Sequence, residues 1–337
     1  MRQLLFHLLS LVLLVLVMAG LLELFVRAIR DDGMQYDLEM WKYARHGKQV
    51  ALSPEIGHEH VPGARFKAMG VDIAINEHGM RNGPIKISRP PGTFRILMVG
   101  DSLIFGWGVP VEDTVSERLE RALNAAQVNT EVLNTGIGNT NTSMQVAAFL
   151  ERWHAFKPDL VILNYFINDA EKTPVYGRST LFDRKSYAWT YFKSRLDILL
   201  RMASAKKGWE NYYRDLYGDG GGWPVAQAAI KTLADYCNKQ GIRLAVVNYP
   251  ELRQLKDYPF AEVTAKVRTT ARANALPFLD LLPSVDGEDP ASLWVSTTDP
   301  HPNAKANRLF ATRLFEWLGS QGLVPIRDGR LVKPGAG

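Results

Sequence analysis

A short polar motif directly after an apolar run is the clearest candidate for chemistry in this sequence. The motif is Gly100-Asp101-Ser102-Leu103, and the run before it spans Phe94–Val99. An apolar, β-branched run closed by glycine predicts a buried strand that ends in a tight turn. Open α/β sheets keep their reacting groups at the carboxyl ends of strands, so Ser102 is a candidate nucleophile. Because position 104 is Ile, the motif is not the Gly-x-Ser-x-Gly elbow of the other large class of serine hydrolases.

Three further polar clusters follow apolar runs in the same way. Residues 131–134 lead into the polar segment 135–142, residues 160–167 lead into Asn168-Asp169, and residues 296–303 open a helix-like segment. In this order and spacing, the four clusters resemble the blocks of the SGNH (GDSL-type) hydrolase superfamily. The resemblance covers roughly residues 93–320.

The resemblance implies a three-layer α/β/α sandwich with a five-stranded parallel sheet, the flavodoxin-like SGNH fold. The residues themselves indicate the same class, because apolar runs alternate with helix-like segments, which predicts a parallel sheet with right-handed crossovers. The expected strands are 94–99, 131–134, 160–167, 242–249 and 277–282, and the expected later helices are 224–240, 260–275 and 302–319. Two capping boxes, Thr114–Glu117 and Thr142–Gln145, predict two further helix starts.

A serine hydroxyl needs a base to take its proton, and the resemblance places His301 opposite Ser102. Pro300 and Pro302 restrain the backbone on both sides of His301. Asp299 would orient the imidazole and stabilise its charged form. The family's acid commonly precedes the histidine by three residues, where this chain has Thr298. Two alternatives therefore stay open: a backbone carbonyl supports His301, or Asp299 caps the last helix.

The resemblance also supplies three hydrogen-bond donors for an oxyanion. They are the backbone N–H of Ser102, the backbone N–H of Asn139 and the side-chain amide of Asn168. The family usually has glycine at the second position, whereas here Gly138 stands just before Asn139. Asparagine visits left-handed conformations more readily than most residues, so a backbone donor at Asn139 is compatible with the pattern. Asp101 is expected to hold the nucleophile turn.

Composition narrows the remaining classes of function. The chain has 337 residues, a formal net charge of +5 and a single cysteine, Cys237. One cysteine excludes an intramolecular disulfide and a cysteine-based metal cluster, and no basic block with interleaved aromatics indicates nucleic-acid binding. No metal or organic cofactor is expected.

His58-Glu59-His60 could form half of a metal site, but without partner ligands nearby a surface loop is the favoured interpretation.

The N-terminus is almost unbroken Leu, Val, Met and Phe from Leu4 to Val26. About 20 apolar residues match the thickness of a bilayer core. A cleaved signal peptide is the alternative, but the run is long for one and a good cleavage site is missing, so an uncleaved anchor over residues 1–30 is favoured. Counting basic residues on each side mildly favours a cytoplasmic C-terminal domain. Single-span proteins that resemble this one generally place the SGNH domain in the periplasm. We therefore expect a single-pass inner-membrane protein whose catalytic domain lies in the periplasm.

Four segments follow from these patterns: the anchor 1–30, a lead-in segment 31–92, an SGNH domain 93–325 and a flexible tail 326–337. Residues 170–222 interrupt the alternation with an aromatic-rich insertion that includes Tyr176, Trp189 and Tyr213. Its aromatic side chains either pack on the core or form a lid that stacks on sugar rings or acyl chains.

The expected function is that of a serine esterase that cleaves acyl esters, with acetyl favoured, on an envelope or exported polysaccharide. Two alternatives remain open. One is a polysaccharide O-acyltransferase that uses the same serine, and the other is a non-catalytic, membrane-tethered protein that binds or assembles carbohydrate.

Overall fold

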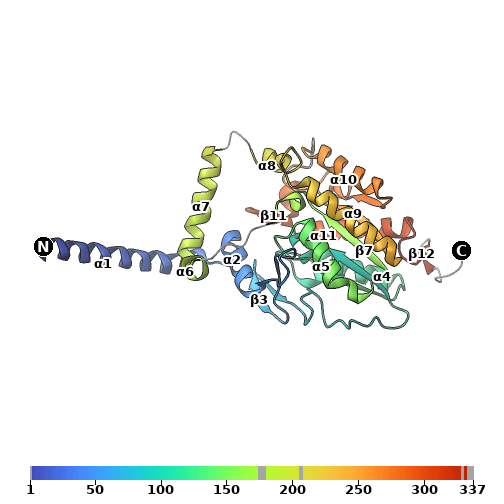
Figure 1. The fold of residues 1–337 in the computed structure, drawn as a ribbon, viewed down its shortest axis with the longest axis horizontal. Coiled ribbons are helices and arrows are strands. Elements are labelled where there is room, and N and C mark those ends of the chain that lie inside the picture. The colour runs from blue at the N-terminus through green and yellow to red at the C-terminus, as the bar shows by residue number, and fades with distance from the viewer. Residues whose placement is uncertain (1, 174–179, 205–207, 328–329, 332–337) are drawn as a thin grey trace.

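A computed structural model describes residues 2–173, 180–204, 208–327 and 330–331. A long N-terminal helix, α1 (Arg2–Phe25), projects from a rounded α/β body (Figure 1). The position of Tyr176 in the expected insertion, and residues 328–329 and 332–337 of the expected tail, lie outside the described residues.

Five parallel strands form the central sheet. They are β5 (Phe94–Val99), β6 (Thr130–Asn134), β7 (Leu160–Tyr165), β8 (Arg243–Asn248) and β9 (Phe278–Asp280), in the order β6-β5-β7-β8-β9. The chain therefore adds β6 on one side of β5 and β7 on the other. The carboxyl end of β5 is the point at which the strand order reverses, where open α/β sheets bind their ligands.

Helices cover both faces of this sheet, which confirms the predicted three-layer sandwich. Successive side chains of a strand point to opposite faces, so Ile96 and Met98 pack beneath α4 and α11, while Leu97 and Val99 pack beneath α5, α9 and α10. The flanking helices are α4 (Val115–Ala125), α5 (Thr142–Glu151), α9 (Trp223–Gln240), α10 (Ala261–Ala273) and α11 (Ala304–Ser320).

The remaining elements are short or lie outside the sandwich. They are the π-turn η1 (Val26–Arg30), α2 (Tyr36–His46), β1 (Lys48–Val50), β2 (His58–His60), β3 (Arg65–Ala68), β4 (Val71–Ala74), α3 (Ser102–Phe105), η2 (Val111–Asp113), η3 (Trp153–Phe156), η4 (Ile167–Ala170), α6 (Leu181–Lys185), α7 (Tyr187–Ser204), α8 (Trp209–Leu216), η5 (Leu282–Val285), η6 (Pro290–Leu293), β10 (Trp294–Ser296), β11 (Asp299–Pro302), β12 (Ile326–Arg327) and β13 (Arg330–Leu331).

One of the two predicted helix caps is correct and the other is wrong. Thr114 caps α4, and its hydroxyl accepts a hydrogen bond from the Glu117 N–H. In α5, by contrast, Thr142 is already the first helical residue, and Asn141 is the cap because its side-chain oxygen accepts from the Met144 N–H at 2.9 Å. Asparagine is at least as good an N-cap as threonine, so the helix starts one residue earlier than predicted.

The lead-in segment forms α2 and two antiparallel hairpins, β1–β2 and β3–β4. Tyr43 of α2 packs against Phe105 and Trp107, which follow the nucleophile motif. The expectation of a surface loop at His58-Glu59-His60 is wrong. Both histidines lie buried on β2. Their burial is possible because each ring donates a hydrogen bond to a backbone carbonyl and so leaves no polar N–H unpaired.

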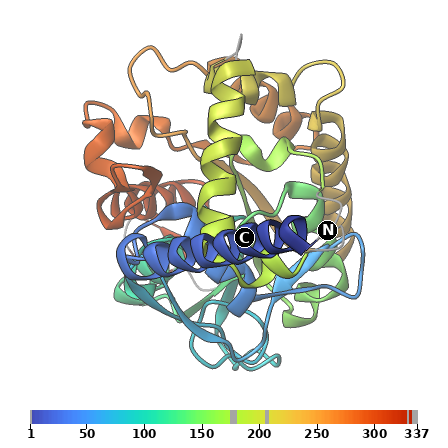
Figure 2. The same cartoon turned by 90° about the vertical axis from the view of Figure 1, so that its left-hand side faces the viewer.

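The insertion divides into two parts with different neighbours. Helix α8 lies on the body, where Trp209 and Tyr213 pack edge-on against Phe260. Helix α7 stands apart from the sandwich and crosses the base of α1 (Figure 2). The aromatic side chains of the insertion therefore do not share one role.

Helix α1 is exposed to solvent along almost its whole length. Within the described part of the chain, it is the one helix long and apolar enough to cross a membrane. A membrane anchor and a signal sequence share this property, and it agrees with the predicted N-terminal span.

Candidate active site

Ser102 is the first residue of α3, immediately beyond the carboxyl end of β5. Asp101 caps this short helix, and its Oδ1 accepts a hydrogen bond from the Leu103 N–H at 2.9 Å. The Ser102 Oγ lies 2.9 Å from His301 Nε2, although 199 residues separate the two in the chain. The structure thus brings the candidate nucleophile and the candidate base into hydrogen-bond contact.

Asp299 completes the hydrogen-bonded series on the other side of the imidazole. Its Oδ1 accepts from His301 Nδ1 at 2.5 Å, and its Oδ2 accepts from Trp107 Nε1 at 2.7 Å. The carboxylate is fully buried. Burial alone would raise the pKa of Asp299, but the hydrogen bonds from His301 and Trp107 outweigh it and lower that pKa. An ionised carboxylate therefore faces the imidazole.

The two-residue spacing between Asp299 and His301 has a simple backbone explanation. Both residues lie on the extended strand β11, in which side chains two positions apart point to the same side. Neither alternative role for Asp299 is seen. Asn303 caps α11 by accepting from two backbone N–H groups, and the Asp299 side chain, not a backbone carbonyl, contacts His301 Nδ1.

The candidate oxyanion donors surround the same cleft as Ser102 and His301. Asn139 follows β6 with φ +64°, a left-handed conformation that asparagine tolerates. Among the hydrogen bonds of the described residues, none uses the backbone N–H of Ser102 or of Asn139. Both donors are therefore available to a ligand.

Asn168 reaches the cleft from η4, directly after β7. Its side-chain amide lies beside the Asp101 carboxyl and partly offsets the effect of burial on the pKa of that group. The amide nitrogen carries two N–H donors, so the side chain can donate to an acceptor in the cleft. Asp101 therefore caps the nucleophile helix and lies beside this amide.

Asp101 and Asp169 form a buried acidic pair behind the site. Burial raises the pKa of Asp101 to about 6 and raises that of Asp169 well above its ordinary value. Asp169 accepts hydrogen bonds from Gln145 Nε2 at 2.7 Å and from the Phe166 N–H at 2.8 Å. These contacts give Asp169 a structural role behind the site.

The lead-in segment holds the loop that carries Asn139, a feature that the sequence analysis missed. The Tyr43 hydroxyl accepts from the Gly138 N–H at 3.0 Å and donates to His60 Nε2 at 2.7 Å. Lys48 Nζ and His58 Nε2 both donate to the Gly138 carbonyl, at 3.1 and 3.0 Å. Both backbone polar groups of Gly138 are thus fixed by side chains from 80 to 95 residues earlier in the chain.

The protonation states within this support are consistent with one another. Burial lowers the pKa of His58 to about 4 and that of His60 to about 3, so both rings are neutral at pH 7. His60 donates from Nδ1 to the Gly79 carbonyl and is therefore free to accept at Nε2 from Tyr43. No group of three or more His, Cys, Asp or Glu side chains within the described residues is arranged to hold a metal ion.

Gly136 allows the same loop to approach the nucleophile helix. A Cβ atom at this position would lie 2.2 Å from the Phe105 backbone nitrogen and 2.9 Å from the Asp101 carbonyl oxygen. Any larger residue would push the loop and α3 apart, so glycine is required by close backbone approach.

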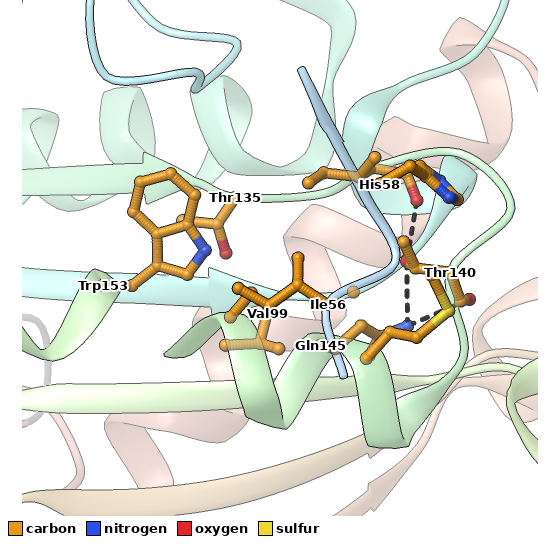
Figure 3. A pocket seen from close by; sticks show the side chains of 11 residues that line it. Ile56, His58, Val99, Thr135, Thr140, Gln145 and Trp153 are labelled. Atoms are coloured by element: carbon orange, nitrogen blue, oxygen red, sulfur yellow. Dashed lines mark hydrogen bonds between the residues drawn. The ribbon is translucent and has the colours of Figure 1, made fainter. Parts of the chain in front are cut away.

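A small pocket lies behind the loop, between Ile56 of the lead-in segment, Trp153, and Thr140 with Gln145 (Figure 3). Its volume is about 10 Å³, which is room for roughly one water molecule. The pocket is therefore a packing gap behind the site and not a substrate-binding site.

The cleft above Ser102 has a volume of about 480 Å³. Tyr36 and Asp37 of α2 form part of its wall, and the Tyr36 ring stacks on His301 with a centroid distance of 6.0 Å. Arg253 and Tyr213 line another part, and Arg253 forms an ion pair with the buried Glu251 at 2.5 Å. In the sequence, Tyr213 is recognisable only as one of the insertion's aromatics, and no pattern marks Tyr36 or Arg253 as residues of the site.

A flavodoxin-like sheet with Ser102 at its switch point, facing His301 and Asp299 of β11, defines an SGNH-type hydrolase domain. The chain belongs to the GDSL-like lipase/acylhydrolase family, whose sequence model matches residues 98–309. The family supports ester hydrolysis as the class of activity.

Among solved structures, the chain is similar to the psychrotrophic esterase EstA from Pseudoalteromonas sp., with 14% identity, a TM-score of 0.45, and coverage of 68% of this chain and 98% of that one. It is also similar to a lipase/acylhydrolase from Enterococcus faecalis, with 13% identity, a TM-score of 0.44, and coverage of 70% and 99%. A two-domain esterase, CEX, active on acetylated mannans, shares 15% identity with a TM-score of 0.45, over 72% of this chain and 53% of that one. No curated protein matches the sequence.

Proposed function

We propose that the protein is a serine esterase that cleaves acetyl esters of an envelope or exported polysaccharide through an acyl-serine intermediate. The observation that carries this proposal is the hydrogen-bonded series Ser102–His301–Asp299 beside the available N–H groups of the cleft. The arrangement supplies a nucleophile, a base, an orienting carboxylate and oxyanion donors, which together are sufficient for acyl transfer to water.

In the first half of the reaction, Ser102 Oγ attacks the ester carbonyl carbon and His301 Nε2 takes the hydroxyl proton. The oxyanion of the tetrahedral intermediate accepts hydrogen bonds from the backbone N–H groups of Ser102 and Asn139 and from the Asn168 amide. His301 then gives its proton to the departing alcohol, and an acyl-serine remains. Each oxyanion donor of this kind contributes about 3 kcal/mol of transition-state stabilisation.

In the second half, water attacks the acyl carbonyl and His301 accepts its proton. Collapse of the intermediate breaks the bond to Ser102, and His301 returns the proton to Oγ. Asp299 stays ionised throughout and stabilises the imidazolium in both halves.

The composition of the cleft wall supports a sugar as the alcohol portion of the ester. Asp37, Glu171 and Arg253 bring charged groups to the wall, and Tyr36 and Tyr213 add aromatic rings. Polar groups that bind hydroxyls, next to ring faces that contact C–H groups, are typical of carbohydrate sites.

The location proposed with this function is the inner membrane, with α1 as a single-pass anchor and the domain in the periplasm. Protease added to spheroplasts should digest the domain while a cytoplasmic marker stays intact. Protection of the domain until the cells are lysed would show that the domain faces the cytoplasm.

The test of the activity is hydrolysis of an aryl acetate by the full-length chain in detergent, beside its Ser102→Ala variant. Turnover that disappears in the variant supports the esterase, and loss of acetate from an acetylated polysaccharide supports the substrate. Acyl transfer to an added glycan in preference to water would indicate an O-acyltransferase. No turnover by a folded wild type would favour the binding protein.

A further inference from the structure

We propose that α7 is an interfacial helix that lies on the bilayer surface, with Trp189, Phe192 and Leu196 inserted among the lipids. The partner is a lipid bilayer, the same one that α1 is long enough to cross. The inference depends on that membrane span and goes beyond the esterase reaction.

One face of α7 exposes three large apolar side chains. Lys193 borders this face, with its Nζ 6.0 Å from the centroid of the Trp189 ring, and the Trp189 indole N–H donates to Asp183 Oδ1. Trp189, Phe192 and Leu196 are 46%, 43% and 55% exposed. Their spacing of three and four residues places them on one side of the helix. The opposite side is covered, because Tyr191 packs against Val26 and Leu38 near the base of α1.

The start of α7 is attached to the end of α1. The Glu23 carboxylate accepts hydrogen bonds from the Ser186 hydroxyl at 2.8 Å and from the backbone N–H groups of Tyr187 and Ala188 at 3.1 and 3.0 Å. A carboxylate at the first turn of a helix also interacts favourably with the helix dipole. The guanidinium of Arg27 lies over the Tyr187 ring, 4.1 Å from its centroid. The start of α7 is therefore fixed at the base of the membrane span.

The orientation of α7 relative to α1 also suits a helix at the membrane surface. In both views α7 runs crosswise to α1, on the side of the body from which α1 leaves (Figures 1 and 2). If α1 runs through a bilayer, α7 lies along its surface. Its 18 residues span about 27 Å at 1.5 Å per residue, which is a suitable length for an interfacial helix.

The chemistry of the exposed face fits this position. Tryptophan is enriched at the membrane–water interface, and Phe and Leu are typical of the buried face of a surface-lying amphipathic helix. On the covered side, Arg195 forms an ion pair with Asp37 of α2 at 2.8 Å, so α7 is held between the body and the bilayer.

The experiment measures membrane depth at single sites of the full-length chain. Variants Phe192→Cys and Leu196→Cys are labelled with the fluorophore NBD and reconstituted into vesicles of phosphatidylethanolamine and phosphatidylglycerol, with and without doxyl-labelled lipids as quenchers. Val225→Cys on α9, at a residue that is 57% exposed, is the matched control on the body, and Leu13→Cys marks the middle of α1. The native Cys237 is buried, and burial raises the pKa of its thiol to about 12, so it stays unlabelled.

We expect doxyl lipids to quench the labels at 192 and 196 several-fold more than the label at 225, together with a blue-shifted emission. Quenching at 13 combined with solvent-like behaviour at 192 and 196 would overturn the proposal. A label at 13 that is not quenched would overturn its premise, the membrane span. Hydrolysis of an aryl acetate by the same labelled proteins reports separately on the proposed esterase, so failure of one proposal is distinguishable from failure of the other.

Discussion

Asp299→Asn is the substitution whose consequence the geometry specifies most closely. In the native protein one carboxylate oxygen accepts from His301 Nδ1 and the other accepts from Trp107 Nε1. An amide of the same shape has only one acceptor oxygen and replaces the other with an N–H donor. Turned with its oxygen toward Trp107, the amide loses the hydrogen bond that Oδ1 accepts from the His301 backbone N–H at 3.1 Å, and its nitrogen donates to Nδ1 and forces the ring proton onto Nε2.

In that tautomer His301 cannot accept the Ser102 proton, so the loss falls on the chemical step. We expect kcat for an aryl acetate to fall about 10⁴-fold with little change in KM, which corresponds to about 5.5 kcal/mol of lost transition-state stabilisation. The measurement is steady-state hydrolysis by the full-length chain, with circular dichroism to verify that each variant is folded.

Trp107 provides the matched control. Trp107→Phe keeps the bond between Asp299 and His301 and removes only the donor to Oδ2, so we expect a loss of no more than about tenfold. In the double variant the amide oxygen is free to turn toward His301 Nδ1, and we expect part of the activity lost in Asp299→Asn to return. A loss of less than tenfold in Asp299→Asn alone would refute the assignment of Asp299 as the orienting group.

Three further predictions test other parts of the site. Tyr43→Phe leaves the Gly138 N–H without its acceptor, which should cost about 1–3 kcal/mol of stability in thermal unfolding and also lower kcat. An unchanged kcat would contradict the role of Tyr43 in holding the oxyanion loop. Asn168→Ala should reduce kcat by about 10²–10³-fold at a similar KM. Asn168→Asp also removes the amide donor, so we expect an equal loss of kcat in that variant. Because burial raises the pKa of Asp101 to about 6, the stability that its neutral form provides is lost as pH rises through 6. Asp101→Asn should therefore raise the unfolding temperature relative to wild type at pH 8 and lose this advantage near pH 4, and the reverse pH dependence would show that the native carboxylate is stabilised.

The sheet and the residues at its edge could be predicted because their signals are local. Apolar runs such as Phe94–Val99 determine the buried strands, and the polar residues that end them meet at one edge of a parallel sheet. The spacing of Asp299 and His301 left two roles open for Asp299, orienting the imidazole or capping the last helix. The extended backbone of β11 favours the first role because it directs both side chains to one side.

The support of the site by the lead-in segment could not be predicted from the sequence. Tyr43, Lys48 and His58 belong to short elements without strong periodicity, and their partner is the backbone of Gly138. His60 acts one step further away, because its partners are the Tyr43 hydroxyl and the Gly79 carbonyl. A hydrogen bond to a backbone group does not require a particular side chain at Gly138, so the residue type there does not reveal its partners. The sequence consequently favoured a surface loop for two histidines that are buried.

The most direct test of the central claim is the site of covalent modification by a fluorophosphonate, a reagent that traps activated serine nucleophiles. The full-length chain is treated with the reagent and digested, and the modified peptide is sequenced by mass spectrometry. We expect a single adduct on Ser102 that is absent from Ser102→Ala and forms much more slowly in His301→Gln. An adduct on another residue, or a Ser102→Ala variant that hydrolyses aryl acetate as fast as wild type, would contradict it.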